Sequence, residues 1–126
     1  YSYEVLADPD NIRLLSIMPG CSTQPLECSL TEVSLWEHPI FTALSYTWGM
    51  DSSWRSHFWI LCNGKRLQVT ANLYQCLIHL RASGVIEQMW VDSICVNQGN
   101  IPERNSQVRH MQVIYQTASR VIAWLG

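Results

Sequence analysis

Residues 89–111 read MWVDSICVNQGNIPERNSQVRHM and join an apolar strand to an amphipathic helix. Met89 to Val96 has the apolar composition of a buried strand, which Asp92 and Ser93 interrupt. Because parallel strands are usually joined through a crossover helix, a strand that leads directly into a helix favours an α/β fold.

The start of this helix carries recognisable end signals. Asn100 can cap it, Pro102 suits its first turn, and Glu103 places a negative charge where the helix dipole favours one. The apolar stripe that follows has helical spacing and consists of Val108, Met111, Ile114 or Tyr115, and Ala118. We expect the helix to be followed by a strand from Arg120 to Leu125.

The segments just before residue 89 extend the same pattern. Residues 58–69 form the clearest hairpin of the chain, because Asn63-Gly64 suits a tight two-residue turn. A helix is predicted from Ala71 to Ala82, where apolar side chains repeat at helical spacing. The second half therefore alternates strands and helices, which favours a partly parallel sheet.

The first half of the chain contains predicted strands without intervening helices. Residues 11–17, 26–36 and 41–48 each have a strand pattern. We expect these strands to form an antiparallel extension. The predicted fold class is α/β, with a partly parallel sheet flanked by helices and an N-terminal antiparallel β extension.

The composition excludes several classes of protein. The chain has 126 residues, 8 basic and 10 acidic side chains, a net charge of −2 and 48% hydrophobic residues. It is too apolar to be disordered and too weakly basic to bind nucleic acid through its charge. No signal peptide is visible, and no apolar run approaches the length that spans a bilayer.

The five cysteines and four histidines are spread along the chain. No C-x-x-C pair occurs, and an odd number of cysteines does not suit a disulfide framework. We therefore expect buried free thiols in a reducing compartment and no metal site.

Polar side chains gather where the strand around Asp92 meets the helix. A carboxylate inside an apolar strand needs a partner, and Arg104 is the expected one. The polar residues expected to converge near the helix start are Asn97, Gln98, Glu103, Arg104 and Gln107. Two interpretations remain open. One is a ligand site at the helix N-terminus, and the other is a polar plug of Asp92, Arg104 and Gln107 that pins strand to helix.

A second candidate site follows the strand predicted at residues 41–48. Ser45, Tyr46 and Trp48 lie where this strand runs into a loop, and the two aromatic rings could stack on a planar ligand. The alternative is that both rings cap the core, as tryptophan usually does.

Several of these segments together resemble a known family. The matching motifs are ALSYTWG (43–49), WVDSICVNQ (90–98), Glu103-Arg104 with Gln107, Met111 and Tyr115, and AWLG (123–126). In this order they resemble the HET domain of fungal heterokaryon incompatibility proteins. The layout is also similar, more faintly, to TIR domains, which implies a TIR/flavodoxin-like core.

The resemblance implies an effector of non-self recognition and programmed cell death in the cytoplasm. The expected partners are other protein domains or further copies of the chain, without a cofactor, nucleic acid or membrane span. The resemblance divides the chain into a β extension (1–40) and a HET domain (41–126). We expect that domain to be truncated, because the chain stops just after an apolar strand.

The alternative function is a TIR-like enzyme that cleaves NAD. Glu103 or Asp92 would then be the catalytic acid or base, and Arg104 would anchor phosphate. The other binding residues would be Ser45, Tyr46, Trp48, Asn97 and Gln107.

Six tryptophans are unusual in so small and weakly charged a chain. We expect Trp90 and Trp124 in the core and Trp48 at a pocket. The others are expected to face the remainder of a larger protein: Trp36, Trp54 and Trp59.

Overall fold

The computed structural model describes residues 3–20, 23–46, 58–84 and 87–124, which build one mixed sheet with helices packed on it. Seven strands lie in this described part, in the order β5-β4-β2-β1-β6-β3-β7. The strands are β1 (Asn11–Ile17), β2 (Glu27–Ser34), β3 (Thr42–Tyr46), β4 (Trp59–Cys62), β5 (Lys65–Gln68), β6 (Met89–Val91) and β7 (Arg120–Trp124). The helices are η1 (Leu35–Glu37), α1 (Ala71–Ala82), α2 (Asp92–Cys95) and α3 (Ile101–Thr117).

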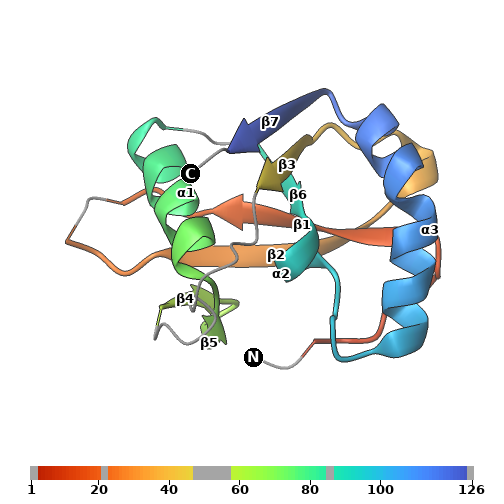
Figure 1. Cartoon of the computed structure of the whole chain (residues 1–126), viewed down its shortest axis with the longest axis horizontal. Helices are drawn as coiled ribbons and strands as arrows, with labels where there is room; N and C mark the ends of the chain where they lie inside the picture. The colour runs from red at the N-terminus through yellow and green to blue at the C-terminus, as the bar shows by residue number, and fades with distance from the viewer. Residues whose placement is uncertain (1–2, 21–22, 47–57, 85–86, 125–126) are drawn as a thin grey trace.

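The sheet combines a parallel and a mixed region. Strand β3 was expected with the antiparallel strands of the first half, but it pairs in parallel with both β6 and β7. Strand β1 is antiparallel to both β2 and β6, and β2 is parallel to β4. The first two strands therefore lie in the middle of the sheet, between β4 and β6, as Figure 1 shows. The α/β class and the partly parallel sheet are confirmed.

The local signals of the second half are confirmed at two places. Strands β4 and β5 form the predicted hairpin, and Asn63 and Gly64 both have positive φ, 51° and 82°. Helix α1 begins after Thr70, whose side chain accepts a hydrogen bond from the Leu73 N–H at 3.2 Å. Both features are set by neighbouring residues, which is why the sequence predicts them.

The strand predicted at Met89 to Val96 is shorter than expected. It ends at Val91, and Asp92 is the first residue of α2. All three residues of β6 are buried, whereas the Asp92 side chain is half-buried. A carboxylate is better tolerated in the first turn of a helix at the edge of the core than inside a fully buried strand.

The apolar core covers both faces of β6. Trp90 is fully buried and meets Tyr115 of α3 edge-on, with ring centroids 5.7 Å apart. Helix α1 contributes Leu73, Cys76, Leu77 and Leu80, the stripe that its sequence predicts. In the view of Figure 1, α1 and α3 lie on opposite sides of the short helix α2.

Helix α3 departs from its predicted apolar stripe at Val108. That side chain is 58% exposed, and the neighbouring Gln107 is buried instead. The Gln107 Nε2 donates to the Asn11 carbonyl at 3.1 Å. This hydrogen bond to the first residue of β1 compensates part of the cost of burying the Gln107 amide. The spacing of apolar residues along α3 cannot predict it.

The thiols are free and buried where the structure describes them, at Cys28, Cys62, Cys76 and Cys95. Burial raises the pKa of Cys95 to about 12, so this thiol is not an activated nucleophile. Within residues 3–20, 23–46, 58–84 and 87–124, no three His, Cys, Asp or Glu side chains form a group suited to a metal ion. Over the same ranges, no helix has the length and apolar composition needed to cross a membrane.

Candidate functional site

The start of α3 is capped as its sequence predicts. Asn100 is the N-cap, and its Oδ1 accepts a hydrogen bond from the Glu103 N–H at 3.2 Å. Pro102 occupies the first turn, where its missing N–H costs no helical hydrogen bond. These local interactions place Glu103 and Arg104 at the end of the helix that lies near α2.

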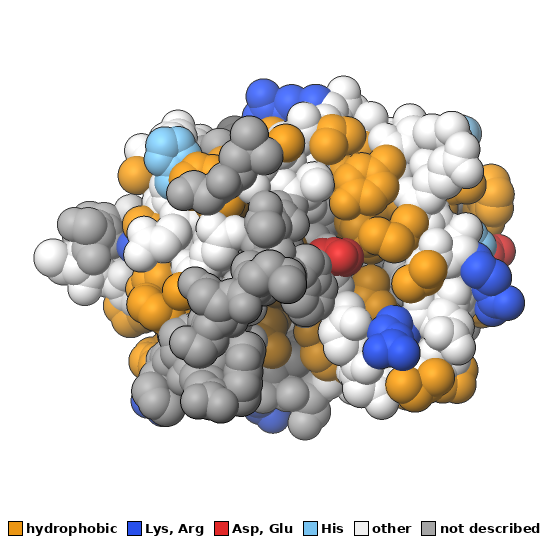
Figure 2. Space-filling model, viewed as in Figure 1, with side chains coloured by type: hydrophobic (Ala, Val, Ile, Leu, Met, Phe, Trp, Pro, Cys, Tyr) orange, Lys and Arg blue, Asp and Glu red, His pale blue; other side chains and the backbone are white. Residues whose placement is uncertain are grey.

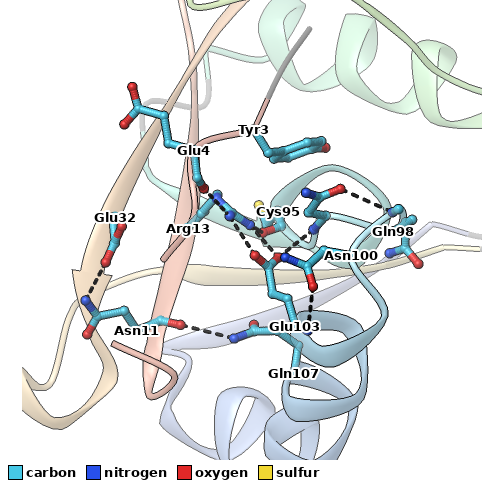
Figure 3. Close-up of polar contacts among 12 residues, drawn as sticks. Tyr3, Glu4, Asn11, Arg13, Glu32, Cys95, Gln98, Asn100, Glu103 and Gln107 are labelled. Carbon is cyan, nitrogen blue, oxygen red and sulfur yellow. Dashed lines mark hydrogen bonds and ion pairs between the residues drawn. The ribbon is translucent and has the colours of Figure 1, made fainter. Parts of the chain in front are cut away.

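Glu103 forms a buried ion pair with Arg13 of β1. Its two carboxylate oxygens accept hydrogen bonds from Arg13 Nη1 at 2.7 Å and from Nη2 at 2.8 Å (Figure 3). The two side chains are 6% and 7% exposed. The Asn97 N–H adds a third hydrogen bond to the same carboxylate at 2.7 Å. This bidentate geometry is the strong form of an arginine–carboxylate pair.

The remaining contacts of Arg13 join the N-terminal segment to α2. Nη1 also donates to the Cys95 carbonyl at 3.0 Å, and Nη2 donates to the Glu4 carbonyl at 2.7 Å. The Tyr3 ring lies against the guanidinium, with its centroid 5.0 Å away. Figure 3 shows Tyr3, Glu4, Arg13, Cys95 and Glu103, which together with the Asn97 backbone form what we call the Arg13 cluster.

The pKa values of the ion pair shift in the directions expected for paired charges. Burial alone would raise the pKa of Glu103. The hydrogen bond from Arg13, the hydrogen bond from the Asn97 N–H and the positive charge of Arg13 outweigh burial, so the pKa of Glu103 is lowered. Burial would lower the pKa of Arg13, and the Glu103 carboxylate outweighs that effect. Both groups are therefore held in their charged forms.

The pairing of Asp92 with Arg104 that the sequence predicted is wrong. No ion pair joins these two described side chains, and the buried carboxylate–arginine pair is that of Glu103 and Arg13. Arg104 is exposed and Asp92 is half-buried. Asp92 is the first residue of a helix instead of lying inside a buried strand, so its carboxylate is at the edge of the core.

Asp92 and Arg104 nevertheless line one cavity, beside α3. It has a volume of about 90 Å³, and we call it the α3 cavity. Its lining residues are Trp90, Asp92, Val96, Gln98, Arg104, Gln107, Val108 and Met111. On the face seen in Figure 2, hydrophobic side chains gather beside α3, with an acidic side chain at the edge of this patch.

The two carboxylates predicted as catalytic do not share this cavity. Glu103 lines a separate one of about 230 Å³, together with Val5, Leu6 and Pro9 of the N-terminal segment. Burial, and after it the charge of Asp92, raises the pKa of Tyr115 on α3. Glu103 is therefore paired with a buried arginine, and Asp92 lines the other cavity.

The predicted binding residues are also distributed between the two places. Arg104 and Gln107 line the α3 cavity, whereas Asn97 contacts Glu103 through its backbone. Ser45 and Tyr46 end β3, where they pair with Ala123 and Trp124 of β7, and Ser45 is exposed. Trp48 lies outside the described residues.

The tryptophans divide between core and surface. Trp90 is fully buried, and Trp124 is partly buried, with its Nε1 donating to Asn72 at 3.1 Å. Trp36 and Trp59 are 62% and 37% exposed, as expected for residues outside the core. Trp54, like Trp48, lies outside the described residues.

Arg13 is the residue of this site that the sequence analysis missed. It was part of a predicted strand, between the apolar residues Ile12 and Leu14. A charge flanked by apolar residues in a strand is the same signal that drew attention to Asp92, because a buried charge needs a partner. The same reasoning predicts that Arg13 is buried and pairs with a carboxylate.

Comparisons with known proteins identify the family. Residues 41–126 match the family model described as heterokaryon incompatibility protein (HET), which is more than half of the chain. The chain belongs to the HET family. Heterokaryon incompatibility protein 6, OR allele, of Neurospora crassa is 38% identical to it over 142 aligned residues. The alignment takes in 100% of this HET-family chain but 21% of that relative, and no solved structure matches.

Proposed function

We propose that this chain is an effector domain of fungal non-self recognition that triggers programmed cell death. The observation that carries the proposal is the 38% identity, over the entire chain, to a protein named for heterokaryon incompatibility. Because the chain spans about a fifth of that relative, the proposal concerns the part that this domain plays in a larger activity.

The geometry supports association with a partner as the mode of action. Glu103, one of the two candidate acids, is held as a carboxylate by Arg13 and the Asn97 N–H. A group with a lowered pKa and a buried cation beside it is a poor general acid near neutral pH. Arg104, one residue further on, is exposed beside the α3 cavity and suits contact with a partner.

Inducible expression of the chain in fungal cells tests the proposal. We expect the parent chain to kill cells, measured by exclusion of a vital dye at matched protein levels. Arg104→Ala should reduce killing, whereas Arg109→Ala, which removes an exposed arginine of the same helix outside the α3 cavity, should not. Cells that survive expression of the folded parent chain would overturn the proposal.

A second candidate function is the cleavage of NAD. The observation that favours it is the place of Asp92, beside a cavity just beyond the carboxyl end of the parallel strand β6, where α/β folds bind ligands. In this alternative the parallel strands β6, β3 and β7 would correspond to a TIR/flavodoxin-like core. Incubation of the chain with NAD, followed by chromatography for nicotinamide, tests it.

The test variant is Asp92→Asn, which neutralises a carboxylate of the α3 cavity. The control variant is Glu87→Gln, which neutralises a carboxylate on the surface. Release of nicotinamide that Asp92→Asn alone abolishes would support the enzyme. A chain that kills cells and releases no nicotinamide would reject the hydrolase and leave the effector function standing.

The domain division and the location complete the proposal. We propose that residues 41–126 form the HET domain and that residues 1–40 are an extension preceding it, in a cytoplasmic protein. Since β1 and β2 pair inside the sheet, the extension should be needed for folding. Expression of residues 41–126 alone tests this point, and a cooperative unfolding transition in that shorter chain would contradict it.

A further inference from the structure

In the described part of the chain, two buried side-chain polar atoms beside α3 have no hydrogen-bond partner. They are the donor Trp90 Nε1 and the acceptor Gln107 Oε1. Trp90 is fully buried and Gln107 is 2% exposed, so bulk solvent does not reach their side chains. Buried polar groups nearly always have a partner, and an unpaired donor together with an unpaired acceptor calls for a physical explanation.

Both residues line the α3 cavity. Its volume of about 90 Å³ exceeds the ~10–15 Å³ that one water molecule needs, so it has room for a group of several heavy atoms. Three apolar side chains, Val96, Val108 and Met111, form part of its wall. A bound group would therefore combine an apolar stem with polar atoms that reach Trp90 and Gln107.

The hydrogen-bonding capacity left at the cavity is narrowly defined. Gln107 Nε2 already donates to the Asn11 carbonyl, so the amide offers its oxygen. Gln98 Nε2 is likewise used, by the Asp92 carbonyl at 2.9 Å. Among the described residues, the buried side-chain atoms left unpaired there are the Trp90 indole nitrogen, which can only donate, and the Gln107 oxygen, which can only accept.

The charges beside the cavity favour a neutral group. Asp92 and Arg104 both line it and have opposite signs. A bound anion would be attracted by Arg104 and repelled by Asp92, and a bound cation the reverse, so the two charges together favour neither sign. A neutral dipolar group avoids both repulsions.

We propose that the α3 cavity binds a neutral carboxamide on a short apolar stem. The carboxamide C=O accepts from Trp90 Nε1, and its NH₂ donates to Gln107 Oε1, which pairs both atoms at once. The carboxamide belongs either to a small molecule or to an asparagine or glutamine side chain of a protein partner. This inference names a ligand for the proposed effector and rests on that function for its consequence in cells, while the binding itself is tested separately.

The test follows the indole N–H signals of the isotopically labelled chain by NMR during titration with isobutyramide. We expect the Trp90 signal to shift at concentrations of ~1–100 mM, as suits a ligand of so few atoms, while those of the exposed Trp36 and Trp59 stay in place. Isobutyrate, which has the same shape and a negative charge, should leave the Trp90 signal unmoved.

Two variants remove the two proposed hydrogen bonds. Trp90→Phe deletes the donor and keeps an aromatic ring, and Gln107→Met deletes the acceptor at similar volume. Each should weaken isobutyramide binding about tenfold, followed through the methyl signal of Met111. Trp36→Phe is the control and should leave binding unchanged. If either variant fails to fold, the other variant and the parent titration still decide the matter.

A short glutamine-containing peptide and its glutamate counterpart distinguish the two sources of the carboxamide. Glutamine-dependent binding at least about tenfold tighter than that of isobutyramide assigns the cavity to a protein side chain, and weaker binding assigns it to a small molecule. A Trp90 signal that ignores both amides, or responds equally to isobutyrate, overturns the proposal. Such a result would overturn the ligand proposal and would not affect the effector function. If the chain binds the amide but cells that express it survive, the effector function alone is overturned.

Discussion

Glu103 and Arg104 are adjacent in the sequence and lie in opposite surroundings. The Glu103 side chain is 7% exposed and pairs with Arg13, whereas Arg104 is exposed beside the α3 cavity. Because an α-helix has 3.6 residues per turn, each residue points about 100° away from the one before. The comparison separates a charge that holds the fold together from a charge that a partner can reach.

The largest effect should come from removing the buried carboxylate. Glu103→Ala leaves Arg13 charged and buried without its partner, and we expect it to lower the free energy of unfolding by about 3 kcal/mol. Urea denaturation of the parent and the variant measures the difference.

The matched control for this prediction is Glu87→Ala. Glu87 also pairs with an arginine, Arg120, at 2.6 Å, but the two side chains are 46% and 55% exposed. Solvent screens such a pair, so the loss should be at most about 1 kcal/mol. Equal losses at both positions would contradict the distinction between the buried and the exposed pair.

A smaller effect should appear as a dependence of stability on pH. The pKa of Glu103 is lower in the folded protein than in the unfolded chain, so the unfolded chain binds more protons in acid. The stabilisation is complete above the ordinary glutamate pKa of ~4.3 and is lost as the pH falls through the lowered value.

Urea denaturation at a series of pH values below ~6, on the parent and on Glu103→Gln, measures this part of the stability. The glutamine cannot ionise, so the variant should be less stable at neutral pH and should lose less stability in acid. Curves that fall in parallel would show that other carboxylates cause the acid sensitivity.

The smallest effect on stability is expected at the neighbouring residue. Arg104→Ala should change the free energy of unfolding by no more than about 0.5 kcal/mol, as for a surface substitution, and should match Arg109→Ala. The same denaturation experiment measures it, and the killing assay then reports on function alone. A loss as large as that of Glu103→Ala would mean that Arg104 supports the fold.

The features predicted correctly from the sequence are those that neighbouring residues determine. The Asn100 cap, the Asn63-Gly64 turn and the apolar stripe of α1 involve residues a few positions apart. The family was also evident, because its motifs are short segments in a fixed order. The convergence of polar residues at the start of α3 was predicted, but their division between two cavities was not.

The wrong predictions concern surroundings that distant segments provide. Asp92 was placed inside a strand because the residues around it are apolar, yet the strand ends at Val91. Val108 was placed in the core, but Gln107 takes the buried position because β1 offers it a carbonyl. Neither outcome is visible in a local pattern.

The sequence by itself determined the class of fold, the limits of α1, the start of α3, the hairpin and the family. The tertiary structure alone decided which arginine neutralises Glu103. Arg13 lies 90 positions away in the chain, and it reaches Glu103 because β1 pairs with β6 and α3 packs beside them. Local preferences depend on the energies of neighbouring residues, whereas the partner of a buried charge depends on which strands and helices pack together.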